Sequence, residues 1–120
     1  GGEIAHAAEL FLFLADRAQH VETLIKPALE EGKVVLCDRH ADSTYVYQAV
    51  ARGLDSTFVR SANAFATGGL KPDLTFLLDL PAEVGLARLK GRDGGQDRLD
   101  RAPLEFHQKV RQGFLDLSEE

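Results

Sequence analysis

Methionine is absent from the 120 residues, even at position 1, and Cys37 is the single cysteine. Because an open reading frame begins with Met, we expect the chain to be an internal portion of a longer protein. One cysteine excludes an internal disulfide and fits a reducing, cytoplasmic setting. No apolar run approaches the roughly 20 residues that a membrane-spanning helix needs, so we expect no membrane partner.

Positive charge is also scarce, because 14 Lys and Arg stand against 19 Asp and Glu, for a net charge of −5 at pH 7. General affinity for nucleic acid is therefore not expected. The glycine-rich phosphate loop with the pattern GxxxxGK[ST] does not occur either. The hydrophobic fraction of 44% is ordinary and allows one globular domain with a modest core.

Two short apolar runs, residues 34–37 and 74–80, predict strands buried on both faces, with the Cys37 thiol buried in the first. Segments with helical spacing surround them: 5–25, about 43–52, 56–67, 81–90 and 103 onward. Pro27 ends the first helix, kinks it, or opens a short second helix that stops at Gly32. Strands separated by helices predict an α/β fold, a parallel sheet flanked by helices in three layers. Two strands make no stable sheet alone, so we expect the fold to be incomplete here, with the missing part before residue 1.

Asp38 and Arg39 directly follow the first predicted strand. Open parallel sheets bind their ligands beyond the carboxyl ends of the strands. There a carboxylate can hold Mg²⁺, directly or through water, and a guanidinium can grip a phosphate with two hydrogen bonds. An ion pair that closes the strand end explains the dipeptide equally well.

Two predicted helix faces carry chemistry that suits a small-molecule pocket. Phe13 and Arg17 are four residues apart, so a ring and a guanidinium can meet a flat base together, although a core ring beside a surface charge is the commoner explanation. The second face offers hydroxyls, a phenol and an amide, and it fits either a pocket or a solvated surface. Its members are Ser43, Thr44, Tyr47 and Gln48.

Basic residues gather in a glycine-rich stretch near the C-terminal third of the chain. A mobile basic loop can close over a polyphosphate, but neighbouring aspartates make a solvated loop equally plausible. The basic members are Arg88, Lys90, Arg92, Arg98 and Arg101.

In order and spacing these motifs resemble the bacterial thymidylate kinases (dTMP kinases), which are P-loop nucleoside monophosphate kinases. The resemblance extends over essentially the whole chain and is carried by residues 15–17, 21–29, 38–40, 43–44, 47–48, 52–55, 72–75, 78–79 and 97–99. It implies an enzyme that transfers the γ-phosphoryl of ATP to dTMP, giving dTDP and ADP, with Mg²⁺ as cofactor. We also expect a homodimer.

The resemblance assigns a role to each matching residue of the dTMP site. Phe13 stacks on thymine and Arg17 bonds the base edge. Ser43 and Thr44 contact the base. Tyr47 packs by the sugar and disfavours a 2′-hydroxyl, and Gln48 lines the pocket wall.

The resemblance likewise assigns the phosphate chemistry. Arg39 holds the dTMP phosphate, and Asp38 lies near the phosphates and Mg²⁺. The lid arginines Arg88, Arg92 and Arg98 reach the ATP phosphates. Asp38, Arg39, Arg92 and Arg98 are therefore the expected catalytic residues.

Two parts of the family pattern have no counterpart in the sequence: the N-terminal P-loop segment and the C-terminal strand and helix. We therefore predict one partial domain, with a core and dTMP site in 1–90, a lid in 91–101 and a helix in 102–120. These 120 residues alone are expected to be inactive. Two alternatives stay open, a noncatalytic nucleotide-binding remnant and a deoxynucleoside kinase.

Overall fold

A computed structural model describes residues 3–90 and 102–120. The described residues belong to two compact units of the chain, which divide between Leu74 and Thr75. Every regular element in these ranges is helical, and none of the described residues belongs to a strand. No helix in the described part of the chain has the length and apolar character needed to cross a membrane.

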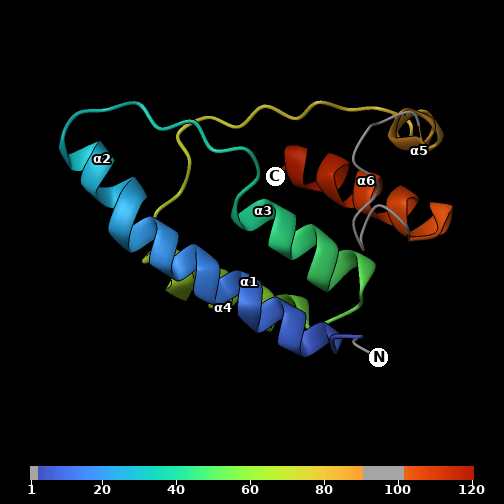
Figure 1. Ribbon diagram of the computed structural model, residues 1–120, viewed down its shortest axis with the longest axis horizontal. Coiled ribbons are helices and arrows are strands. Elements are labelled where there is room, and N and C mark those ends of the chain that lie inside the picture. The colour runs from blue at the N-terminus through green and yellow to red at the C-terminus, as the bar shows by residue number, and fades with distance from the viewer. Residues whose placement is uncertain (1–2, 91–101) are drawn as a thin grey trace. The chain divides into compact units, whose positions relative to one another are not determined.

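The first unit begins with a continuous helical rod of three parts, α1 (His6–His20), the π-helical segment η1 (Val21–Ile25) and α2 (Lys26–Glu30) (Figure 1). Pro27 lies in the first turn of α2, directly after the wider π-helical turns. Proline has no N–H to donate and its ring clashes with the carbonyl four residues earlier, so wider turns before it relieve the conflict. The structure thus matches the alternative in which Pro27 opens a short helix, which ends in a turn at Gly32.

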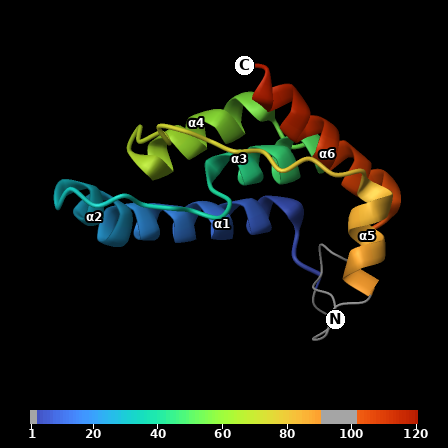
Figure 2. The same cartoon turned by 90° about the horizontal axis from the view of Figure 1, so that it is seen from above.

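The rod packs against two further helical pieces, α3 (Ala41–Thr44) with its continuation η2 (Tyr45–Ala51), and α4 (Ser56–Thr67) (Figure 2). Their shared core contains Leu10, Leu14, Ala49 and Val59. Burying each of the larger of these side chains stabilises the unit by about 1.5–3 kcal/mol. This packing fixes α1, α3 and α4 relative to one another, which positions the site described below.

The bounds predicted for α4 are confirmed, and its two ends explain why. The Asp55 carboxylate accepts a hydrogen bond from the Phe58 N–H at 3.1 Å, which satisfies one of the free donors of the first turn. Gly68 ends the helix in the left-handed conformation with φ 62°, which glycine adopts without strain.

The two predicted strands are not formed among the described residues, and the burial predicted for them is not observed. Residues 34–37 form an extended segment that returns from the end of α2 to the start of α3 (Figure 1). Leu36 is 93% exposed, Leu78 in the second segment is also 93% exposed, and the Cys37 thiol is exposed as well. An apolar run is buried only when neighbouring strands pair with it and helices cover the sheet, and the described residues supply no such neighbours.

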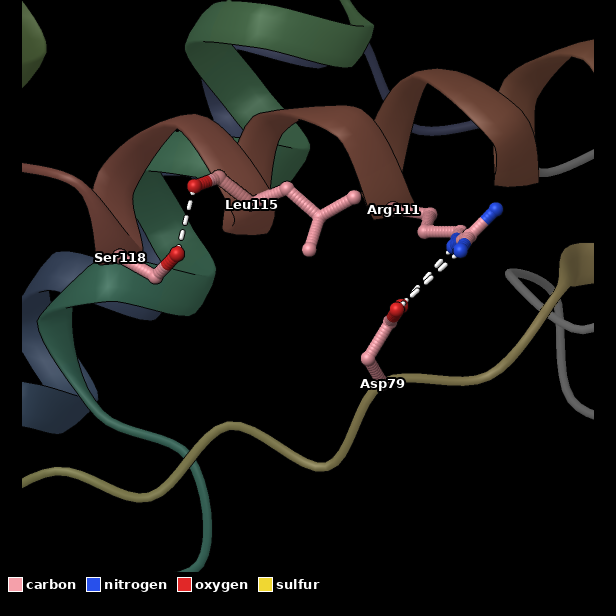
Figure 3. A network of polar contacts seen from close by, with 4 residues as sticks. All are labelled: Asp79, Arg111, Leu115 and Ser118. Atoms are coloured by element: carbon pink, nitrogen blue, oxygen red, sulfur yellow. Dashed lines mark hydrogen bonds and ion pairs between the residues drawn. The ribbon is translucent and has the colours of Figure 1, made fainter.

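The second unit consists of the extended segment 75–81, α5 (Ala82–Lys90) and α6 (Leu104–Ser118), with α5 packed against α6. Arg111 of α6 forms a two-point ion pair with Asp79, with Nε to Oδ1 at 2.8 Å and Nη2 to Oδ2 at 3.1 Å (Figure 3). The hydrogen bond from Arg111 lowers the pKa of the Asp79 carboxyl. The pair therefore fastens the extended segment to α6 while Asp79 stays ionised.

Candidate functional site

The candidate site lies where the extended segment turns into α3. Arg39 occupies this turn with φ 65°, the one positive φ at a non-glycine residue among the described positions. The turn directs the chain into α3, whose first turn is closed by a hydrogen bond from the Ser43 N–H to the His40 carbonyl at 3.0 Å. A non-glycine residue in this conformation costs about 1–3 kcal/mol, a strain that proteins retain chiefly at functional positions.

Arg17 reaches this turn from α1 and is bonded to three acceptors. Its Nη1 donates to Thr44 Oγ1 at 2.5 Å and to Asn63 Oδ1 at 3.3 Å, and its Nη2 donates to the His40 carbonyl at 3.1 Å. Burial lowers the pKa of the guanidinium, while Asp16 and Cys37 act in the opposite direction. An arginine stays charged under such a shift, so the site contains a fixed and partly buried positive charge.

Two of the five N–H groups of Arg17, on Nε and Nη2, have no hydrogen-bond partner among the described residues. A partly buried guanidinium with spare donors suits a ligand that offers oxygen acceptors. Phe13 lies four residues before Arg17 on α1 and is 39% exposed, so its ring is not part of the buried core. The two side chains can therefore meet a ligand from the same helix.

Arg39 and Tyr47 form a second contact on the exposed side of the turn. Arg39 Nη1 donates to the Tyr47 hydroxyl at 3.1 Å, and the guanidinium carbon lies 5.4 Å from the centre of the ring. Asp38, the neighbour of Arg39, is exposed. The turn thus presents a guanidinium and a carboxylate to solvent, next to the fixed charge of Arg17.

Two predicted site residues are buried rather than open to a ligand. Thr44 is 3% exposed and receives the bond from Arg17. Gln48 is 1% exposed, and its Nε2 donates to Glu9 Oε1 at 3.2 Å. Ser43 is partly buried beside them. In this arrangement Thr44 and Gln48 support the site from inside, and direct contact with a ligand stays a prediction for both.

Sequence reasoning missed Glu9 and Asn63, the buried polar partners of Gln48 and Arg17. A signal for Asn63 was present, because it lies four residues after the core residue Val59 on α4 and so shares its buried face. A polar side chain on such a face needs a hydrogen-bond partner.

The structure does not test the predicted lid at this site. Arg92 and Arg98 lie outside the described residues. Arg88 is exposed on α5, in the second unit. Within residues 3–90 and 102–120, no group of three or more His, Cys, Asp or Glu is placed to hold a metal ion.

The whole chain is similar to proteins of one family. A family profile described as thymidylate kinase matches residues 1–120. The chain is 56% identical to a thymidylate kinase of Desulfovibrio desulfuricans, over 99% of this chain and 58% of that protein. It is 60% identical to a thymidylate kinase of Carboxydothermus hydrogenoformans, over 92% of this chain and 54% of that protein. A solved thymidylate kinase of Ehrlichia chaffeensis matches with a TM-score of 0.76 and 30% identity, covering 99% of this chain and 55% of that one.

These matches fix the class of the fold as that of the P-loop nucleoside monophosphate kinases. The chain belongs to the thymidylate kinase family. It spans between 54% and 58% of the length of the two relatives named above, so a whole protein of their size would contain much besides these residues.

Proposed function

We propose that the whole protein is a thymidylate kinase, which transfers the γ-phosphoryl group of ATP to dTMP and yields dTDP and ADP. The observation that carries this proposal is the gathering of two arginines at the start of α3. Arg17 is bound to Thr44 and to the His40 carbonyl, and Arg39 is bound to Tyr47. One guanidinium is held and partly buried and the other is exposed, so the two offer separate donors for the base and the phosphate of a nucleotide.

The fixed guanidinium suits the base. Arg17 would donate its spare N–H groups to a carbonyl of thymine, and Phe13 would stack on the ring from the same helix. Ser43 and Thr44 would meet the remaining edge, with Gln48 at the wall. Tyr47 would lie by the sugar and crowd a 2′-hydroxyl. Membership of the family supports these assignments.

The exposed guanidinium suits the phosphate. Phosphoryl transfer requires little covalent chemistry from the protein, so positioning and charge neutralisation supply most of the catalysis. Arg39 would hold the dTMP phosphate in line for attack. Arg88, Arg92 and Arg98 would neutralise the oxygens of the transferred group when the lid closes.

The donor chemistry at the turn fits Mg²⁺. Asp38 offers one exposed carboxylate, and Mg²⁺ commonly binds through one or two carboxylates together with waters and substrate phosphates. The ion would supply positive charge to the phosphate oxygens. Asp38 would orient it, directly or through a bound water.

We also propose a parallel sheet and a homodimer for the whole protein. Residues 34–37 and 74–80 would pair with further strands of the whole protein into a parallel sheet, which would cover their exposed apolar side chains. The protein would act in the cytoplasm as a homodimer, with dTMP and ATP as its small-molecule partners.

The test is an acceptor assay on the whole encoded protein with ATP and Mg²⁺. We expect dTDP from dTMP and no dTMP from thymidine. Phosphorylation of thymidine would favour a deoxynucleoside kinase, and dTMP binding without turnover would favour a noncatalytic binding protein. The 120 residues alone, which have no phosphate loop, should stay below about 1 s⁻¹, the lower end of ordinary kinase rates.

A further inference from the structure

Asn63 of α4 is 8% exposed, and its side chain joins two parts of the candidate site. Its Oδ1 accepts from Arg17 Nη1 at 3.3 Å, and its Nδ2 donates to the Ala41 carbonyl at 3.0 Å. A guanidinium only donates and a carbonyl only accepts, so a single orientation of the amide satisfies both partners. Asn63 therefore ties α1, the first residue of α3 and α4 together.

The role of Asn63 in holding Arg17 is seen in how the N–H groups of the Arg17 guanidinium are used. Nη1 has two N–H groups, and Thr44 and Asn63 together use both. Thr44 is the last residue of α3 and His40 directly precedes that helix, whereas Asn63 approaches from α4. Thr44 and the His40 carbonyl bond two different nitrogens of the guanidinium, and Asn63 adds a third bond that restrains it further from a separate helix.

We propose that Asn63 is a positioning residue for base recognition, which orients Arg17 so that its remaining N–H groups meet the base of the nucleotide. The inference rests on the proposed function, since it concerns the same dTMP site. Asn63 itself would not touch the substrate. Its effect should therefore appear in the preference between bases and not in the affinity for the sugar and phosphate.

The experiment compares dTMP with dCMP binding to the whole encoded protein by calorimetry. Thymine presents a carbonyl oxygen where cytosine presents an amino group, so a donor from Arg17 favours thymine. Asn63→Ala should weaken dTMP binding about tenfold, the size expected for one hydrogen bond to a charged group. The affinity for dCMP should hardly change, so the ratio between the two nucleotides falls by the same factor.

Thr67 provides a matched control on the same helix. It lies one turn after Asn63, is 3% exposed, and its hydroxyl bonds the carbonyls of Asn63 and Ala64 within α4. Thr67→Val should lower the midpoint temperature of unfolding and leave the ratio of the dTMP and dCMP affinities unchanged. In an Arg17→Ala background, Asn63→Ala should have no further effect on the ratio.

An unchanged ratio, or equal losses for both nucleotides, would overturn the positioning role and leave Asn63 a merely structural residue. If the alanine variant fails to fold, Asn63→Ser keeps a polar group and should lower the ratio in the same direction, and an unchanged ratio there overturns the role too. Failure of the wild-type protein to bind dTMP would instead overturn the proposed function, so the two failures are distinguishable.

Discussion

Arg39 donates a hydrogen bond to the hydroxyl of Tyr47 at 3.1 Å while its guanidinium lies 5.4 Å from the centre of that ring. Both contacts are exposed to solvent, and an exposed cation–π contact contributes only about 0.5–1 kcal/mol. A phosphate offers two charge-assisted hydrogen bonds, which are stronger. The contact with Tyr47 therefore keeps Arg39 in place without competing seriously with a phosphorylated ligand.

Arg39→Ala should weaken dTMP binding roughly ten- to hundredfold, since charge-assisted hydrogen bonds are worth about 1.5–3 kcal/mol. Thymidine, which has no phosphate, should bind the variant as well as it binds the wild type. Calorimetry with both ligands on the whole protein measures the difference. Arg60→Ala is the matched control, because Arg60 also lies over a tyrosine ring, that of Tyr45, at 4.3 Å. Equal losses for both ligands in Arg39→Ala would show that Arg39 is structural.

The backbone at Arg39 gives a separate prediction. Its φ of 65° is a conformation that glycine adopts freely and alanine does not. Arg39→Gly should therefore be more stable than Arg39→Ala by about 1 kcal/mol, although both variants lose the guanidinium. Urea denaturation of the two variants measures this gap. An alanine variant at least as stable as the glycine variant would mean that the turn relaxes when the side chain is removed.

Gly68 and Gly85 should respond to alanine in opposite directions. Gly68 has φ 62°, and a Cβ there would lie 2.7 Å from Lys26 Nζ, so Gly68→Ala should destabilise the protein by about 1 kcal/mol or more. Gly85 is in the interior of α5, where a Cβ would lie 3.7 Å from Leu80 Cδ2, an ordinary contact. Gly85→Ala should stabilise α5 by about 0.5–1 kcal/mol. Thermal midpoints of both variants provide the comparison, and a shift of the same sign in both would contradict it.

Stability near neutral pH should depend on His40. Burial, then the charges of Arg17 and His20, lower the pKa of His40, and Asp42 opposes them. The unfolded chain therefore binds a proton at a higher pH than the folded one. The contribution of neutral His40 to the free energy of unfolding should be complete above the ordinary histidine pKa of about 6.5. It should decrease as the pH falls below that value toward the lower pKa of the folded state.

His40→Gln should flatten this decrease, as measured by urea denaturation at intervals between about pH 7.5 and 5. His6→Gln, at the exposed first residue of α1, serves as the control and should keep the slope of the wild type. A slope that persists in His40→Gln would assign the dependence to other groups.

The helices could be predicted from the sequence where local signals act together. Asp55 and Gly68 mark both ends of α4, and the observed bounds agree. The strands could not be predicted reliably, because an apolar run such as 34–37 indicates only that its side chains need neighbouring strands and helices to cover them. Pairing is a property of the neighbouring strands, and the run is exposed when they are absent from the described residues. Pro27 left three alternatives open because a π-helical turn before a proline has no reliable local signature.

The candidate site could be predicted in part. Arg17, Thr44 and Tyr47 were singled out from their helical spacing and Arg39 from its place after a predicted strand. The structure joins Arg17 to Thr44 and Arg39 to Tyr47. Which of the site residues are buried could not be predicted from their spacing. Gln48 was expected at a pocket wall, but its amide lies inside against Glu9, from a helix 39 residues away in sequence. The identity of a partner so distant along the chain leaves no periodic signal, whereas the spacing of Asn63 from Val59 did indicate a buried position.

The exposed apolar segment 74–78 has a consequence for self-association. Leu74, Phe76 and Leu78 are 72%, 82% and 93% exposed in an extended stretch without charge, proline or glycine. Such stretches are templates for intermolecular β-pairing and fibrils. Asp73 and Asp79 bracket the segment as charged gatekeepers, and the lowered pKa of Asp79 keeps one of them ionised under mild acid. The chain should therefore begin to aggregate only in strong acid, when Asp79 becomes protonated and loses its ion pair with Arg111.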